Sequence, residues 1–143
     1  MKKISAQFIF WEIFPSLLIV VFSYTAVDKL LHISSFIRNL VSQPINRSIA
    51  FGLAYTIPIL ELLIVVMLLW NRTRKQGLYI SLLLLAIFTT YISLILLNLF
   101  PKIPCSCGGV ISSMGWHTHL VFNLGLIAIN MISINSKAGG TGN

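Results

Sequence analysis

Two cysteines one residue apart, Cys105 and Cys107, are the side chains of this sequence best suited to chemistry. Such a pair can close a small, strained disulfide, and strained disulfides are easily reduced, which suits thiol–disulfide exchange. Trp116, His117 and His119 follow closely and would shield the pair or exchange protons with it. Two thiolates and two imidazoles are also a ligand set for zinc or copper(I). A structural disulfide or a pair of free thiols is a third interpretation.

Long apolar runs flank this polar segment. Hydrophobic residues make up 57% of the 143 residues, charged residues only 9%, and the mean hydropathy is +0.91, whereas about a quarter of a soluble domain is charged. Runs of close to the roughly 20 residues that cross a bilayer predict helices at about 13–31, 50–70, 78–97 and 114–134. The alternation typical of barrel strands is absent. We therefore predict an all-α bundle of four transmembrane helices.

The four runs leave no room for a separate soluble domain. We expect residues 1–135 to form a single membrane domain and the Gly-rich tail, residues 136–143, to be disordered. Lys2 and Lys3 resemble the charged start of a signal peptide, but no small-x-small cleavage site follows, so the first run should remain as a helix. In residues 32–48, apolar positions recur at helical spacing and predict a short amphipathic helix on the outer surface.

The net charge of +7 does not indicate nucleic-acid binding, because the basic residues lie at the ends of the apolar runs, where they orient the chain and meet lipid headgroups. Six lie on one side of the membrane and four on the other: Lys2, Lys3, Arg72, Arg74, Lys75 and Lys137 against Lys29, Arg38, Arg47 and Lys102. This excess predicts cytoplasmic termini in a bacterial inner membrane. The cysteine segment would then face the periplasm, where disulfides persist.

All three carboxylates lie in or beside the membrane spans. Glu12 is at the inner boundary and is expected to be solvated. Asp28 follows the first apolar run and is expected either to pair locally with Lys29 or to take part in a site. Glu61 lies near the middle of the second span, where a charged side chain costs about 2.5–3.5 kcal/mol. Glu61 is therefore either a functional group or a partner in a hydrogen bond within the bundle.

Other polar side chains share the depth of the cysteine segment. Tyr91 lies in the outer half of the third span, and His119 and Asn123 lie four residues apart in the fourth, on one helix face. Together with Asp28 they would line a pocket beneath the cysteines if these faces point inward. No cofactor is required, although a quinone could bind near Tyr91 and His119. Hydrogen bonds between helices would also explain these residues.

The sequence resembles the DoxX-like membrane proteins, and within them the MauE branch in its Bacteroidetes version. The matching stretches are Tyr24-x4-Lys29-Leu30, Pro58-Ile59-Leu60-Glu61, Phe88-x2-Tyr91, Cys105-Ser106-Cys107-Gly108-Gly109 and Trp116-x2-His119-x3-Asn123. The resemblance implies a redox-associated inner-membrane protein that assists disulfide formation in a periplasmic enzyme subunit, alongside a thioredoxin-like partner. It also implies that the two cysteines are the redox pair, that Trp116, His119 and Asn123 support them, and that Lys29 and Glu61 occupy family positions.

Three hypotheses follow. The first is a thiol–disulfide oxidoreductase, or its membrane accessory, that acts on a periplasmic partner. The second is a metal-binding or metal-transfer protein that uses Cys105, Cys107, His117 and His119. The third is a non-enzymatic subunit of a larger membrane complex or homo-oligomer. Because one cysteine pair cannot relay electrons to a second pair in the same chain, the first hypothesis needs a partner with another pair, which we favour, or direct transfer to a quinone.

Overall fold

The structure is a computed structural model that describes residues 9–99 and 115–136. Every regular element in these residues is helical: η1 (Ile9–Ile13), α2 (Phe14–Leu31), α3 (Ile33–Val41), α4 (Arg47–Leu69), α5 (Arg74–Leu96) and α6 (Trp116–Ser136). Four segments are long and apolar enough to cross a membrane, namely Trp11–Leu31, Arg47–Leu69, Arg74–Leu96 and Trp116–Asn135. The predicted all-α fold with four transmembrane helices is confirmed. The expected disordered tail lies outside the described residues, except Ser136, which ends α6.

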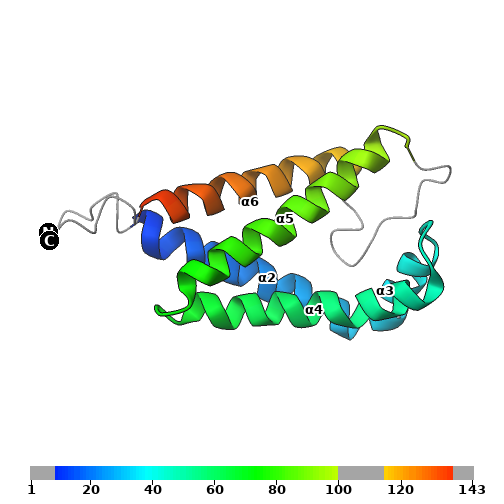
Figure 1. Cartoon of the computed structure of the whole chain (residues 1–143), viewed down its shortest axis with the longest axis horizontal. Helices are drawn as coiled ribbons and strands as arrows, with labels where there is room; N and C mark the ends of the chain where they lie inside the picture. The colour runs from blue at the N-terminus through cyan, green and yellow to red at the C-terminus, as the bar shows by residue number, and fades with distance from the viewer. Residues whose placement is uncertain (1–8, 100–114, 137–143) are drawn as a thin grey trace, which may run out of the picture.

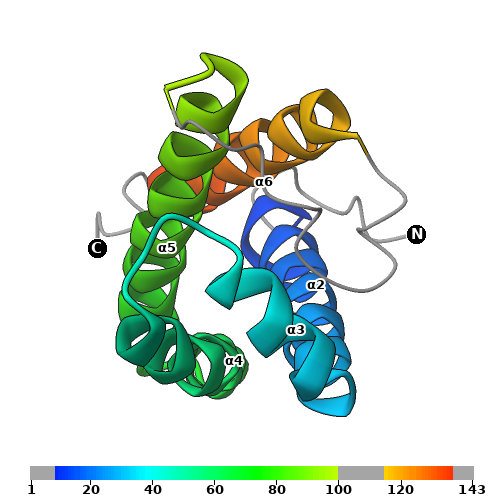
Figure 2. The same cartoon turned by 90° about the vertical axis from the view of Figure 1, so that its right-hand side faces the viewer.

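The four long helices run up and down in chain order (Figure 1). α2 packs mainly on α4, α5 mainly on α6, and α4 also contacts α5. One end of the bundle, which we call the α3 end, carries the end of α2, the start of α4, the end of α5 and the start of α6. Seen from this end, α3 lies beside α2 and α4, with the four long helices around it (Figure 2). The segment that contains both cysteines connects α5 to α6 at the α3 end.

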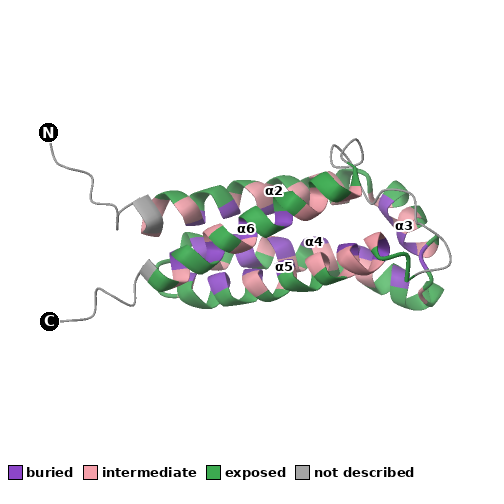
Figure 3. Ribbon diagram, turned by 90° about the horizontal axis from the view of Figure 1, so that it is seen from above, coloured by how far each residue is buried: buried purple, intermediate pink, exposed green. Residues whose placement is uncertain are grey.

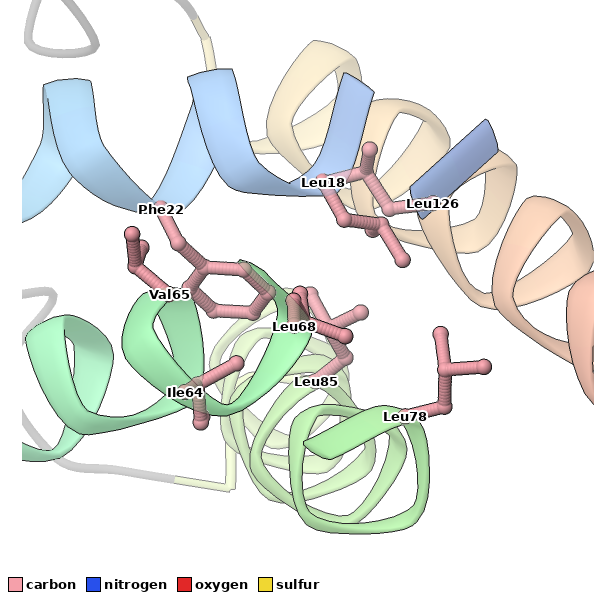
Figure 4. Close-up of a cluster of buried hydrophobic side chains, with 8 residues drawn as sticks. All are labelled: Leu18, Phe22, Ile64, Val65, Leu68, Leu78, Leu85 and Leu126. Carbon is pink, nitrogen blue, oxygen red and sulfur yellow. The ribbon is translucent and has the colours of Figure 1, made fainter. Parts of the chain in front are cut away.

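The core of the bundle is an apolar cluster to which all four long helices contribute. Its buried members are Leu18, Phe22, Ile64, Val65, Leu68, Leu78, Leu85 and Leu126 (Figure 4). The outward faces of the helices are exposed (Figure 3). They too are apolar, as the exposed side chains of Val20, Leu83 and Val121 illustrate. Since lipid tails are as apolar as these side chains, the helices are held together by close packing and by polar contacts between them.

The predicted amphipathic helix is present as α3, and it packs against the protein. Phe36 and Leu40 on its apolar face are buried against Ala50 and Ala54 in the first turns of α4. The two alanines are small, which lets the helices approach closely. α3 therefore covers the α3 end of the bundle with its apolar face turned inward, and its exposed face carries Arg38.

Hydrogen bonds at the helix ends fix where the chain enters α4 and leaves α5. The Asn46 side chain caps α4 by accepting a hydrogen bond from the Ser48 amide at 2.9 Å. At the end of α5, Asn98 adopts a φ of 54°, and the Leu99 amide donates to the Leu94 carbonyl at 3.2 Å. This is the Schellman arrangement, in which a left-handed residue ends a helix. It sets the direction in which the chain leaves α5.

At the opposite end of the bundle, Arg74 joins three segments. The residue is 8% exposed, and its guanidinium donates to the Leu68 carbonyl at 3.1 Å, to the Trp11 carbonyl at 3.4 Å and to the Glu12 carboxylate at 3.1 Å. It also lies 5.6 Å from the centre of the Trp11 ring. The Glu12 side chain is 41% exposed, so it is solvated as expected, and it pairs with Arg74 in addition. Up-and-down packing brings the start of α5 beside the chain that leads into α2, and this places the two charges together.

Candidate functional site

A buried ion pair joins α2 to α4. The Lys29 ammonium donates to both carboxylate oxygens of Glu61, at 2.8 and 3.1 Å, and to the Thr25 carbonyl at 3.3 Å. The Glu61 side chain is 2% exposed and that of Lys29 is 17% exposed. The Thr25 hydroxyl donates to the Phe22 carbonyl at 3.3 Å, and the Phe36 ring of α3 lies 5.9 Å from the ammonium. The carboxylate is thus buried and paired, as a charged group inside a membrane must be.

The local pairing expected between Asp28 and Lys29 is replaced by two separate pairs. Asp28 turns to the imidazole of His32 one turn later, with 3.2 Å between the carboxylate and Nδ1. Consecutive residues on a helix are about 100° apart around its axis. The Lys29 side chain therefore points into the bundle toward α4, while the Asp28 side chain points toward His32 at the end of α2. The His32 side chain is 62% exposed, which makes this second pair an exposed one of small energetic weight.

The buried face of α6 is a mainly polar stripe. His119, Asn123, Leu126, Asn130 and Ser133 are spaced alternately by four and three residues, which places them along one side of the helix. Asn123 is 4% exposed and Asn130 and Ser133 are fully buried. His119 is half-buried and lies within electrostatic range of Lys29. The stripe therefore starts near the α3 end and continues toward the opposite end of the bundle.

One hydrogen bond fixes the register between α5 and α6. The Asn130 amide donates to the Ser81 hydroxyl at 2.6 Å, and the hydroxyl in turn donates to the Leu78 carbonyl at 2.9 Å. One turn nearer the α3 end, Leu85 and Leu126 both belong to the apolar cluster. Because the helices are antiparallel, each further turn along α5 meets the corresponding earlier turn of α6.

The next turn brings Thr89 of α5 opposite Asn123 of α6. The Asn123 Nδ2 and Thr89 Oγ1 atoms are both buried, and neither has a hydrogen-bond partner in the part of the chain that the structure describes. A buried polar group without a partner costs about 1–3 kcal/mol. The Asn130 Oδ1 atom is a third buried group without a partner in the described residues, so the polar stripe of α6 is a costly part of the core.

Polar side chains from all four long helices form one layer, which lies next to the apolar cluster on the side nearer the α3 end. Thr25, Glu61, Thr89 and Asn123 are each three or four residues from Phe22, Val65, Leu85 and Leu126, respectively. Each of the four long helices thus carries a polar side chain at about the same depth. We call Thr25, Lys29, Glu61, Thr89, His119 and Asn123 the polar layer. It brings together four predicted site residues, Lys29, Glu61, His119 and Asn123.

Tyr91 contributes to a different contact. Its hydroxyl donates to the side-chain oxygen of Gln43, a buried residue in the connection between α3 and α4. This hydrogen bond ties the outer part of α5 to the segment that follows α3. Gln43 gave no signal in the sequence, because it lies in an irregular, polar connection.

The two histidines near the start of α6 lie on different faces. His117 is exposed and His119 is half-buried, as expected for residues two apart on a helix, which are separated by about 200°. A single metal ion bound by both imidazoles would require the first turn of α6 to unwind. Cys105 and Cys107 lie outside the described residues, and within residues 9–99 and 115–136 no three His, Cys, Asp or Glu side chains form a metal-binding group. Trp116 is half-buried as the first residue of α6.

Comparisons with known proteins identify the family. Residues 7–136 match the family described as Methylamine utilisation protein MauE. The searches of curated proteins and of solved structures found no match. The family match spans all four long helices and the segment with the two cysteines. The chain belongs to the MauE family and is a multi-pass protein of the bacterial inner membrane.

Proposed function

We propose that this protein carries out thiol–disulfide exchange with a periplasmic partner through Cys105 and Cys107. The observation that carries the proposal is the position of the polar layer. Its ion pair and the start of the polar stripe lie between the apolar cluster and the α3 end, and the segment with both cysteines connects α5 to α6 at that end. Membership of the MauE family supports a membrane accessory role of this kind.

The exchange balances without further reagents. A thiolate of the partner attacks the Cys105–Cys107 disulfide, and a mixed disulfide forms as one cysteine leaves as a thiolate. The second partner thiol then displaces the other cysteine. The partner gains a disulfide, and this protein is left with two thiols, which must be reoxidised before the next cycle. A thioredoxin-like protein or its substrate fits this role, because such proteins present a reactive thiol on an accessible surface.

Thiol trapping in intact cells tests the proposal. Cells are treated with a membrane-impermeant alkylating reagent, then lysed, and the two cysteines are analysed by mass spectrometry. We expect a mixture of dithiol and disulfide, with the thiols labelled from outside. Two cysteines that stay reduced and unlabelled under all conditions contradict both the exchange and the periplasmic location.

A cysteine variant tests the partner. In Cys107→Ser, the Cys105 thiolate can still attack the disulfide of the oxidised partner, which is the exchange in reverse, but the second cysteine that would displace the partner is absent. The mixed disulfide should therefore accumulate as a covalent complex that reductant dissolves. Cys105→Ser is the matched variant, and the two should differ in yield because only one of the two cysteines exchanges directly with the partner. If Cys105→Ser/Cys107→Ser retains full biological function, the protein is a structural subunit and the exchange is refuted.

A further inference from the structure

We propose that the connection between α4 and α5 is a binding site for one anionic phospholipid, of the phosphatidylglycerol class. Arg72 and Lys75 bind the lipid phosphate, and the glycerol backbone lies in a cavity beside Trp70. The connection lies at the end of the bundle opposite α3 (Figure 1). The inference is independent of the proposed thiol–disulfide exchange, because it uses only the residues around this connection.

The connection lies at the depth of the lipid headgroups. α4 ends at Leu69 and α5 begins at Arg74, and both helices are long and apolar enough to cross a membrane. The chain turns sharply between them, since the Thr73 and Arg74 amides both donate to the Trp70 carbonyl, at 3.1 and 2.9 Å. Trp70 is exposed, and an exposed tryptophan at the end of a span is typical of the membrane–water boundary.

The connection carries two cations that no acidic side chain neutralises. The Arg72 and Lys75 side chains are exposed and have no hydrogen bond or ion pair within residues 9–99 and 115–136. The three acidic side chains of the sequence are engaged elsewhere: Glu12 by Arg74 at 3.1 Å, Asp28 by His32 at 3.2 Å and Glu61 by Lys29 at 2.8 Å. An anion from another molecule can therefore bind both cations.

A cavity of about 500 Å³ opens beside these cations. Its walls are mainly apolar and come from four consecutive residues, Trp70, Asn71, Arg72 and Thr73. A cavity of this size is large enough for a small ligand. The Thr73 hydroxyl donates to the Met67 carbonyl at 2.9 Å, which leaves the guanidinium and the Asn71 amide as polar groups at the rim. Apolar walls next to a cation fit the part of a phospholipid where the acylated glycerol meets the phosphate.

The start of α5 extends the site along the helix. Lys75, Tyr79 and Leu83 follow one another at intervals of four residues and are all exposed, so they share one face. Helical side chains point back toward the N-terminus of their helix, which for α5 is the headgroup layer. The Lys75 ammonium and the Tyr79 hydroxyl therefore lie near the lipid phosphates, and Leu83 continues the face as a surface for an acyl chain.

The charges select an anionic headgroup. Clusters of Lys and Arg at a membrane surface attract anionic lipids, and a guanidinium binds a phosphate with parallel hydrogen bonds. The ammonium of phosphatidylethanolamine would lie beside two cations, and Glu12, the acidic residue of this end, is held by Arg74. The phosphatidylglycerol headgroup has no ammonium, and its hydroxyls can hydrogen-bond to the Asn71 side chain. Free phosphate would satisfy the cations but leave the apolar walls in water.

Quenching of Trp70 by brominated lipids measures binding at this place, because bromine on an acyl chain quenches an indole only at short range. The full chain with Trp11→Phe/Trp116→Phe retains only Trp70. It is reconstituted in phosphatidylcholine vesicles with brominated phosphatidylglycerol or brominated phosphatidylethanolamine. We expect phosphatidylglycerol to be preferred about thirtyfold, the combined effect of two basic residues at a membrane surface. In Trp11→Phe/Trp70→Phe, which retains only Trp116 at the α3 end, no such preference is expected.

Matched charge variants assign the site. In the background that retains Trp70, Arg72→Gln/Lys75→Gln should abolish the preference for phosphatidylglycerol. Arg38→Gln/Arg47→Gln is the control, because it removes the same charge from two exposed residues at the α3 end and should leave the preference unchanged. Unchanged circular dichroism establishes that the variants fold. Equal quenching by both lipids, or an equal loss of preference in both charge variants, overturns the proposal.

A competition experiment separates a lipid from a free anion. Vesicles with brominated phosphatidylglycerol are titrated with inorganic phosphate at constant ionic strength. The quenching of Trp70 should not change, because the acyl chains and the apolar cavity hold the lipid in place. If millimolar phosphate relieves the quenching, the connection binds a soluble anion and the lipid proposal fails.

Discussion

Removing Lys29 should destabilise the protein more than removing Glu61. At 2.8 Å the attraction within the pair is about 6 kcal/mol for an effective dielectric constant of about 20. The desolvation of two ions, at several kcal/mol each, offsets most of it. The net contribution of the pair is therefore small, whereas the cost of breaking it is large.

The asymmetry follows from burial. In Lys29→Met, the 2% exposed Glu61 loses the donor to both oxygens, which should lower the free energy of unfolding by about 3–5 kcal/mol. In Glu61→Gln, the 17% exposed Lys29 keeps the Thr25 carbonyl and reaches water, so a loss of about 1–3 kcal/mol is expected. The double variant Lys29→Met/Glu61→Leu should lie within about 1–2 kcal/mol of the natural protein, since no charge remains buried.

Reversible unfolding in mixed detergent micelles, followed by circular dichroism, measures these differences. Asp28→Asn is the control, because its pair with the exposed His32 should contribute less than about 1 kcal/mol. The reasoning is refuted if the double variant loses as much stability as the two single variants combined. It is also refuted if Lys29→Met unfolds like the natural protein.

Two further predictions concern the opposite end of the bundle. A Cβ atom at Gly77 would lie 3.0 Å from the Met67 Cβ and 3.3 Å from the Leu68 amide nitrogen. Gly77→Val should therefore lower the free energy of unfolding by about 1–3 kcal/mol through overpacking. The same unfolding assay measures this loss, and Gly52→Val is the control, because a Cβ atom at Gly52 would have nothing within 4 Å. Arg74→Lys keeps the charge but not the planar fork that reaches three acceptors. It should therefore expose the η1 region to limited proteolysis, and unchanged cleavage would argue against its role.

The sequence predicted the helices well because their signal is local. Apolar runs of sufficient length have one solution in a bilayer, and the amphipathic spacing around Phe36 and Leu40 predicted α3. The α6 stripe was partly visible, since His119 and Asn123 are four residues apart. Extending the same spacing to Asn130 and Ser133 would have shown that the buried face of α6 is polar over most of its length.

The contacts between helices could not be predicted in the same way. Asp28 and Lys29 are neighbours in the chain, so the sequence favours a local pair. The rotation of α2 instead turns Lys29 toward Glu61, 32 residues later. Likewise, Arg74 reaches Glu12 across 62 residues. Such pairs depend on which helices are adjacent and on the depth at which each residue lies in the bundle. The spacing of residues within one helix encodes neither the neighbouring helix nor this depth.

The polar stripe of α6 also constrains how the chain is inserted during synthesis. The mean hydropathy of the α6 span is 1.4, against 2.2 for α5, and an isolated α6 would expose Asn123 and Asn130 to lipid. Polar groups in hydrocarbon cost free energy unless a neighbouring helix satisfies them. α6 should therefore leave the translocon together with α5, as a helical hairpin already joined by the bond between Asn130 and Ser81. In the nascent chain, α5 should thus shield the polar face of α6 from lipid while both helices enter the bilayer.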